Sequence, residues 1–133
     1  RVDDAIHAVR AAKKEGILPG GGASLCYVSS TLNVKTKNEG EDTGVEIMKR
    51  SLHAPFLRIL KNAGLNPADY REFEGWGYGV DVIDGKVKDM RRAGIIDPLL
   101  VTKSALVNAF SVATTILSTD CVISNVRDYE GNR

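Results

Sequence analysis

The chain has 133 residues, enough for one domain with a sizeable buried core. Its 43% hydrophobic and 26% charged residues are typical of a soluble globular protein, and its formal net charge of +1 predicts neither a nucleic-acid surface nor a membrane-binding surface. Two distant cysteines in apolar runs exclude a disulfide scaffold, no zinc-type spacing occurs, and we expect no run to span a membrane.

The first part of the chain predicts two helices joined by a glycine-rich turn. An apolar stripe opposite charged residues predicts an amphipathic helix over residues 2–14, and a mostly apolar run predicts a second helix over residues 22–32. Between them stand a proline and then Gly20, Gly21 and Gly22. Glycine is needed where φ is positive or where something approaches the backbone closely. This stretch is therefore either a tight turn or a binding surface.

A polar loop precedes a long predicted helix. Thr43 and Glu46 have the spacing of a capping box, which predicts the start of that helix. Its apolar positions continue past Pro55, where we expect a kink or a restart, and Gly64 is expected to end it. A further short helix is expected over residues 66–74, because Asn-Pro is a common opening.

The last third of the chain predicts a hairpin, a long helix and a strand. Two short β-prone segments flank Asp84-Gly85 in "GYGVDVIDGKVKDM", which is a strong hairpin signal. Apolar residues at helical spacing predict a helix over about residues 98–118. The run "CVISNV" predicts a terminal strand that pairs with the hairpin or with a neighbouring chain.

Four stretches occur in order along nearly the whole chain: "RVDDAIHAVRAAKKEGILPGGGASL", "KNAG", "YGVDV" and "AGIIDPLLVTKSALVNAFSVATTILST". Together they resemble the C-terminal quarter of a group I chaperonin, the family of GroEL and the sixty-kilodalton heat-shock proteins. The resemblance implies a mainly α fold: the helical bundle of the C-terminal half of the equatorial domain, with a small β-hairpin and a C-terminal β-strand. Residues 1–14 would be the last helix of the intermediate, or hinge, domain, and residues 15–133 the C-terminal half of the equatorial ATP-binding domain.

The resemblance also implies which residues meet the nucleotide. The turn of Gly20, Gly21 and Gly22 would be the wall against which the ribose packs, because a backbone without side chains lets a ligand come close. Asp4 matches the catalytic aspartate of the family, which orients and activates the water that attacks the γ-phosphate. Without the resemblance, Asp4 is better explained as an acid favoured at a helix start.

Three further positions match the nucleotide site of the family. Asp97 matches the carboxylate that accepts hydrogen bonds from the ribose hydroxyls, and it also suits an N-cap before Pro98. Asp81 and Val82 match the segment that lies against adenine. Family members usually carry asparagine at the position of Asp81, and the exchange removes a donor and adds charge, so the contact from this side chain is in doubt. A backbone contact from Val82 needs no particular side chain.

The resemblance implies an ATPase that drives protein folding and refolding inside a ring. Its cofactors would be ATP and Mg²⁺. The phosphate-binding loop and the metal-binding acid belong to the N-terminal half, so we expect no metal ligand in this chain and no ATP hydrolysis by the isolated chain. Expected partners are sister subunits in a seven-membered ring, usually two rings stacked, a small co-chaperonin lid and unfolded client proteins, with no nucleic acid or membrane. Bacterial cytoplasm, mitochondrial matrix and plastid stroma all fit.

Two other interpretations stay open. The chain can be a helical interaction module without chemistry of its own, in which the glycines form only a turn. ATP binding by the complete protein, or images of seven-fold rings, would separate this interpretation from a chaperonin. Alternatively, the isolated chain can pack into a non-native oligomer through apolar surfaces such as the helix at about residues 98–118.

Overall fold

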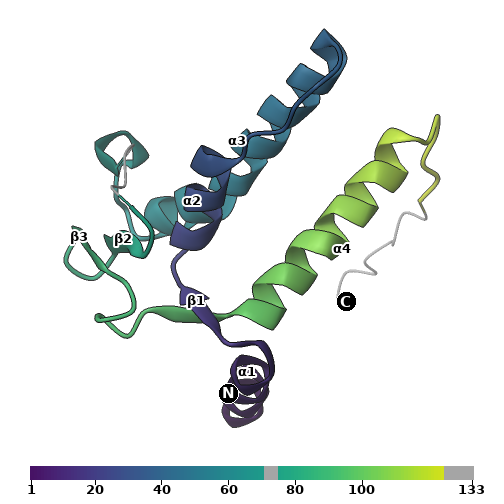
Figure 1. Ribbon diagram of the computed structural model, residues 1–133. Coiled ribbons are helices and arrows are strands. Elements are labelled where there is room, and N and C mark those ends of the chain that lie inside the picture. The colour runs from purple at the N-terminus through teal and green to yellow at the C-terminus, as the bar shows by residue number, and fades with distance from the viewer. Residues whose placement is uncertain (71–74, 125–133) are drawn as a thin grey trace, which may run out of the picture. The chain divides into compact units, whose positions relative to one another are not determined.

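The computed structural model describes residues 1–70 and 75–124 (Figure 1). It divides the chain into two compact units, Arg1–Thr102 and Lys103–Arg133. The elements are α1 (Val2–Glu15), β1 (Ile17–Pro19), α2 (Ala23–Thr31), α3 (Glu39–Asn62), the 3₁₀ helix η1 (Pro67–Tyr70), β2 (Tyr78–Asp81), β3 (Lys86–Asp89), β4 (Ile96–Pro98) and α4 (Leu99–Leu117). Helices dominate, as the sequence predicts.

The helix α1 confirms the first predicted helix. Asp3 and Asp4 lie in its first turn and two lysines lie in its last turn, an arrangement that suits the helix dipole. Gly16 ends the helix at φ 92°, a conformation that glycine adopts without strain. None of its residues is buried, and its apolar stripe stays exposed, with Val2 at 74% and Val9 at 68%. The stripe therefore has no cover within the described part of the chain.

The long helix α3 begins one turn earlier than predicted. Asn38 is its N-cap: the Asn38 Oδ1 atom accepts from the backbone N–H of Glu41 at 3.0 Å, and the Glu41 carboxylate accepts from the N–H of Lys37 at 2.7 Å. This pair resembles a capping box, except that Glu41 accepts from the residue before the N-cap and not from the N-cap itself. The predicted cap at Thr43 is wrong, because its hydroxyl lies inside the helix and donates to the carbonyl of Glu39.

The same helix continues through Pro55 to Asn62, so the predicted restart at the proline does not occur. The short helix predicted next is present as η1, and residues 71–74 of that prediction lie outside the described residues. α2 packs along α3, and the hydroxyl of Ser29 donates to the carbonyl of Lys49 at 3.0 Å between them. The strands β1 and β2 contact α2, and η1 contacts α3.

The core lies where α2, α3 and the hairpin meet. Its buried residues are Cys26, Phe56, Leu60 and Val80, with Leu65, Tyr70 and Val82 packed against them. Burial raises the pKa of the Cys26 thiol to about 11, so the thiol stays protonated at neutral pH. Cys26 is therefore a small apolar core residue, as its position in an apolar run indicates.

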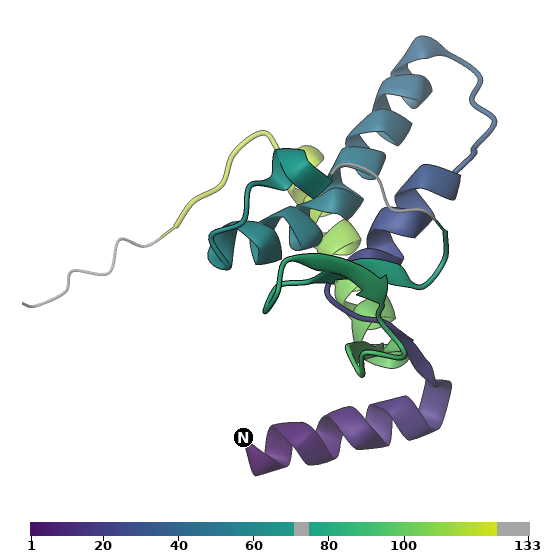
Figure 2. The same ribbon diagram turned by 90° about the vertical axis from the view of Figure 1, so that its left-hand side faces the viewer.

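Two antiparallel strand pairs complete the first unit (Figure 2). The predicted hairpin is confirmed: β2 pairs with β3, and Gly85 in the connecting loop takes a φ of 67°. The second pair, β1 with β4, is not predicted from the sequence. It places Leu18 opposite Asp97, and it continues into hydrogen bonds from Gly20 N–H to the Ile95 carbonyl at 2.9 Å and from Leu99 N–H to the Gly16 carbonyl at 3.1 Å.

The helix α4 confirms the long helix predicted near the end of the chain. None of its 19 residues is buried. With this length and a mean hydropathy of 1.4, the helix is long and apolar enough to cross a membrane. The expectation that no run approaches such a span is therefore wrong, although length and composition alone do not assign the helix to a membrane. Residues 121–124 form no strand with the hairpin, so that pairing of the predicted terminal strand is wrong; pairing with a neighbouring chain stays a prediction, and residues 125 and 126 lie outside the described residues.

Candidate functional site

The glycine turn between β1 and α2 is closely packed on several sides. Gly21 and Gly22 have φ of 65° and 79°. A Cβ at Gly20 would lie 3.1 Å from the backbone of Ile95, and one at Gly22 would lie 2.9 Å from the backbone of Phe56. Side chains at these positions would displace β4 or α3. Packing and backbone conformation alone thus require Gly20 and Gly22.

The turn and the hairpin meet at Met90, which is completely buried. A Cβ at Gly21 would lie 3.0 Å from the Met90 methyl group, and one at Gly79 would lie 2.9 Å from Met90 and 2.8 Å from the Cβ of Ala23. The side chain of Met90 therefore sets the spacing between the first turn of α2 and strand β2. Sequence reasoning missed this role, because one methionine beside a polar stretch carries no local signal.

Asp97 lies on β4 beside the glycine turn. Its neighbour Ile96 is opposite Pro19, the residue that precedes the turn. Within the described residues, the Asp97 carboxylate makes no hydrogen bond and no ion pair. Desolvation raises the pKa of Asp97 above its usual value, although the residue remains accessible to solvent. The structure thus holds an unpaired, partly desolvated carboxylate next to a backbone turn.

The side chain of Asp81 is already engaged within the hairpin. One carboxylate oxygen accepts from the N–H of Ile83 at 3.0 Å, and the other accepts from the Lys88 ammonium at 2.7 Å. The Lys88 hydrogen bond is the main reason that the pKa of Asp81 lies below its usual value. Val82 follows in the loop and packs against the core. Of the two residues predicted to contact the base, Asp81 thus has both carboxylate oxygens hydrogen-bonded within the hairpin, whereas Val82 has no polar side chain.

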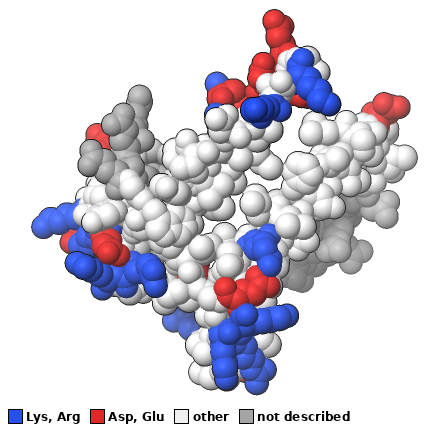
Figure 3. Space-filling view, viewed as in Figure 1, with Lys and Arg blue, Asp and Glu red and all other residues white. Residues whose placement is uncertain are grey.

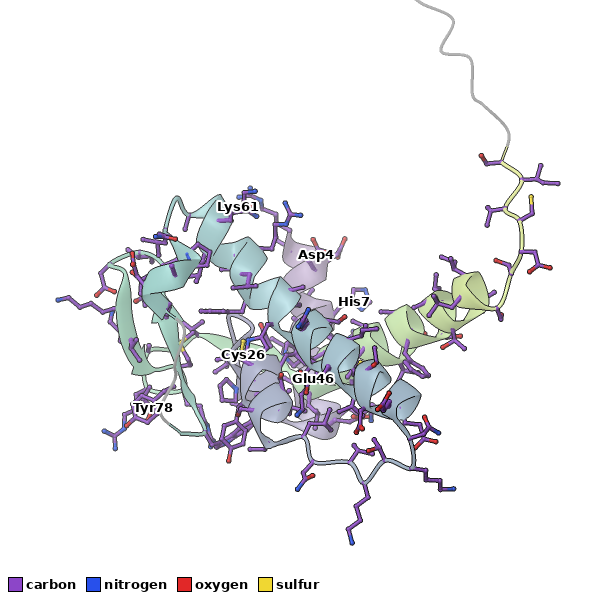
Figure 4. All side chains as sticks on the ribbon, turned by 90° about the horizontal axis from the view of Figure 1, so that it is seen from above. Asp4, His7, Cys26, Glu46, Lys61 and Tyr78 are labelled. Atoms are coloured by element: carbon purple, nitrogen blue, oxygen red, sulfur yellow. The ribbon has the colours of Figure 1, made fainter. Side chains whose placement is uncertain are left out.

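Asp4 lies on α1, at the end of the helix that is farther from the glycine turn. It lies in the first turn of α1, twelve residues before Gly16, which is about 18 Å along a helix axis. Figure 2 shows the N-terminus at the end of α1 far from β1, and Figure 4 labels Asp4 on that helix. No described residue forms a hydrogen bond or ion pair with its side chain. The role of Asp4 stays a prediction.

Lys88 is the charged residue that sequence reasoning missed. Strand periodicity contains the signal, because Lys86 and Lys88 alternate with Val87 and so share one face of β3. Only the register of the hairpin shows which carboxylates that face meets.

Charged side chains gather over α1, over the hairpin and near the start of α3, with uncharged surface between them (Figure 3). Among the described residues, no three His, Cys, Asp or Glu side chains are placed to hold a metal ion together. The geometry can therefore offer a carboxylate acceptor and backbone groups to a ligand, while its residues alone present no metal-ligand set.

Residues 1–127 match the model of the TCP-1/cpn60 chaperonin family. The protein "Chaperonin homolog Hsp-60, mitochondrial" of Caenorhabditis elegans is 44% identical over 131 residues, which are 95% of this chain and 23% of that protein. The solved structure "Crystal structure of group III chaperonin in the open state" superposes with a TM-score of 0.69 and 29% identity, over 85% of this chain and 25% of that chain. This chain spans about a quarter of the length of both relatives.

Proposed function

Since this chain belongs to the TCP-1/cpn60 chaperonin family, we propose that it is the C-terminal quarter of a chaperonin subunit. The subunit binds and hydrolyses ATP and uses that energy to assist the folding and refolding of non-native proteins inside a ring. In this proposal the chain supplies the ribose and base side of the ATP site, residues 1–14 form the last helix of the hinge domain, and residues 15–133 belong to the equatorial domain.

The observation that carries the proposal is the carboxylate of Asp97. This carboxylate accepts no hydrogen bond and forms no ion pair in the described part of the chain, and it is exposed, so it is free to accept hydrogen bonds from a ligand. Ribose hydroxyls are such donors, and the adjoining turn of Gly21 and Gly22 allows a sugar to approach the backbone closely. Met90 lies next to both Gly21 and Gly79, so it connects the glycine turn to the hairpin. In this proposal the hairpin segment of Val82 covers the base.

The reaction requires groups that lie outside this sequence. Mg²⁺ would neutralise phosphate charge when bound, and no metal-ligand set is present among the described residues, so its ligands and the phosphate-binding loop are assigned to the rest of the subunit. Asp4 would orient the attacking water and accept its proton once the hinge helix closes over the site. The isolated chain is accordingly expected not to hydrolyse ATP.

The exposed apolar surface supports the proposed assembly. α4 exposes Val107, Phe110 and Val112 at 62%, 59% and 59%, more than the free surface of a soluble helix usually shows. We assign these side chains to contacts with the rest of the subunit. Sister subunits in stacked seven-membered rings, a co-chaperonin lid and unfolded clients complete the proposal. The bacterial cytoplasm or an organelle matrix would be the compartment, with a mitochondrial relative favouring the latter.

Replacing Asp97 by alanine in the full-length protein should weaken ATP binding by about 1–3 kcal/mol, because the ribose hydroxyls lose a charged acceptor. Binding of 2′,3′-dideoxy-ATP, which lacks those hydroxyls, should be equal in the variant and the wild type. Calorimetric titration of both nucleotides measures this. A variant that keeps the full wild-type preference for ATP would show that Asp97 does not bind the ribose.

Asp97→Asn is the folding control for this experiment. Because burial raises the pKa of Asp97, its contribution to the free energy of unfolding is largest below the unfolded-state value of 3.8 and is lost as pH rises through the folded-state value. Removing the charge should therefore leave the protein at least as stable as wild type at pH 7, with the difference shrinking in acid. Weak ATP binding by a stable variant then reports on the site.

A further inference from the structure

Lys88 holds two carboxylates at the tip of the hairpin. Its ammonium nitrogen lies 2.7 Å from the Oδ2 atom of Asp81 and 2.7 Å from the Oδ2 atom of Asp84. The register pairs Gly79 with Lys88 and Asp81 with Lys86, so Lys88 and Asp81 are on the same face of the two strands. The Asp81 side chain is only 13% exposed, which shields this pair from solvent more than a typical surface ion pair.

The same carboxylates fix the loop that joins the strands. Asp81 accepts the N–H of Ile83 at 3.0 Å through its other oxygen, and Asp84 accepts the N–H of Lys86 at 3.2 Å. The hydroxyl of Tyr70 donates to the carbonyl of Gly85 in the same loop at 2.9 Å. Lys88 thus connects both side chains that shape the loop of residues 82–85.

Lys88 also offsets negative charge on this surface. Hydrogen bonds to Lys88 are the main cause that lowers the pKa of Asp81 and of Asp84, so these contacts favour the charged form of both carboxylates. No other ion pair of either carboxylate is found in the described part of the chain. Without the ammonium, two neighbouring negative charges would stand on the loop that the proposed function places beside the base.

We propose that Lys88 is a positioning residue of the nucleotide site. It holds the loop of residues 82–85 so that Val82 keeps its place against the core, and it offsets carboxylate charge that would otherwise repel an anionic nucleotide. This inference rests on the proposed function, because it takes the hairpin to be the base side of an ATP site. Lys88 itself touches neither the reacting atoms nor, in this role, the nucleotide.

The test replaces Lys88 by methionine in the full-length protein, which keeps the stem of the side chain and removes the charge. The KM for ATP should rise about 3–10-fold at low salt, should approach the wild-type value at high salt, and kcat should stay within about twofold. Lys86→Met is the matched control: it removes the same charge from the same face of β3, and Lys86 forms no ion pair with a described residue. Its KM should rise less than that of Lys88→Met, because Lys86 acts on Asp84 only through a weaker charge interaction without an ion pair. The KM of Lys88→Arg should stay close to that of the wild type.

A double variant separates charge from simple loss of structure. Asp81→Asn removes one of the two carboxylates that Lys88 compensates, so adding Lys88→Met to Asp81→Asn should raise KM less than Lys88→Met does in the wild-type protein. Equal KM values for Lys88→Met and Lys86→Met would overturn the proposal, and an equal rise in KM from Lys88→Met with and without Asp81→Asn would overturn the charge offset. A wild-type protein that does not bind ATP would instead overturn the proposed function, and this inference with it.

Discussion

Replacing Asp4 by alanine in the full-length protein should lower kcat for ATP hydrolysis by about 10²–10⁴-fold, the usual contribution of a positioned general base. ATP binding should change little, because phosphoryl-transfer sites bind the nucleotide mainly through other groups. The fold should also be unaffected, since the Asp4 side chain is exposed and has no hydrogen-bond or ion-pair partner among the described residues. Rapid-mixing measurement of a single turnover gives the rate directly.

Asp3→Ala is the matched control for this prediction. Asp3 is the adjacent acid in the first turn of α1, so it has the same interaction with the helix dipole. Its replacement should leave kcat within about twofold of wild type. A single-turnover rate of Asp4→Ala within threefold of wild type, or equal losses in both variants, would contradict the assignment.

Replacing Gly22 by alanine should lower the free energy of unfolding of the first unit by about 2–4 kcal/mol. Alanine is strained at a φ of 79°, and its Cβ would lie 2.9 Å from the backbone of Phe56, so α3 must shift. Hydrogen exchange of the α2 amides measures this local stability in the full-length protein.

Two other glycines separate the causes of that loss. Gly16 has a φ of 92°, and a Cβ added there would meet nothing within 4 Å, so Gly16→Ala should show strain alone, about 1–2 kcal/mol. Gly44 lies inside α3 with open space and no positive φ, so Gly44→Ala should stabilise the helix by about 0.5–1 kcal/mol. If Gly22→Ala were no worse than Gly16→Ala, close packing against Phe56 would not be the reason for this glycine.

The elements with strong local signals were predictable. The apolar stripe of α1 and the Asp84-Gly85 turn act over a few residues, and both elements appear where expected. The start of α3 was not, because Gly40 and the polar residues around it make the stretch before Thr43 look like a loop. The cap formed by Asn38 and Glu41 outweighs the low helix propensity of those glycines.

Non-local pairing explains most of what sequence reasoning missed. β1 and β4 are each three residues long and end in proline, and they lie far apart in the chain. No local sequence pattern therefore predicts that they pair. The apolar residues at 121–124 have high β propensity, but they do not pair with the hairpin of their own chain, since propensity alone supplies no partner strand.

The site residues stay a prediction, and their geometry could not be predicted from the sequence. A family resemblance pointed to the glycine turn, Asp97 and Val82, and the structure places the turn next to Asp97 and links it to the hairpin through Met90. The hydrogen bond from Lys88 to Asp81 depends on the register of two strands, which the sequence alone does not give. The relation of Asp4 to the turn depends on α1, none of whose residues is buried in the described part of the chain, so no local packing fixes it.

Photolabelling of the full-length protein with 2-azido-ATP, followed by peptide mapping, tests most directly whether this chain forms the base side of an ATP site. The azide sits on the base, so the label should fall on the hairpin loop around Val82 or on the adjoining glycine turn, and excess ATP should suppress it. The Lys61–Gly64 segment at the end of α3 is an internal reference that should stay unlabelled. ATP-suppressible labelling confined to residues outside the hairpin and the glycine turn would contradict the account.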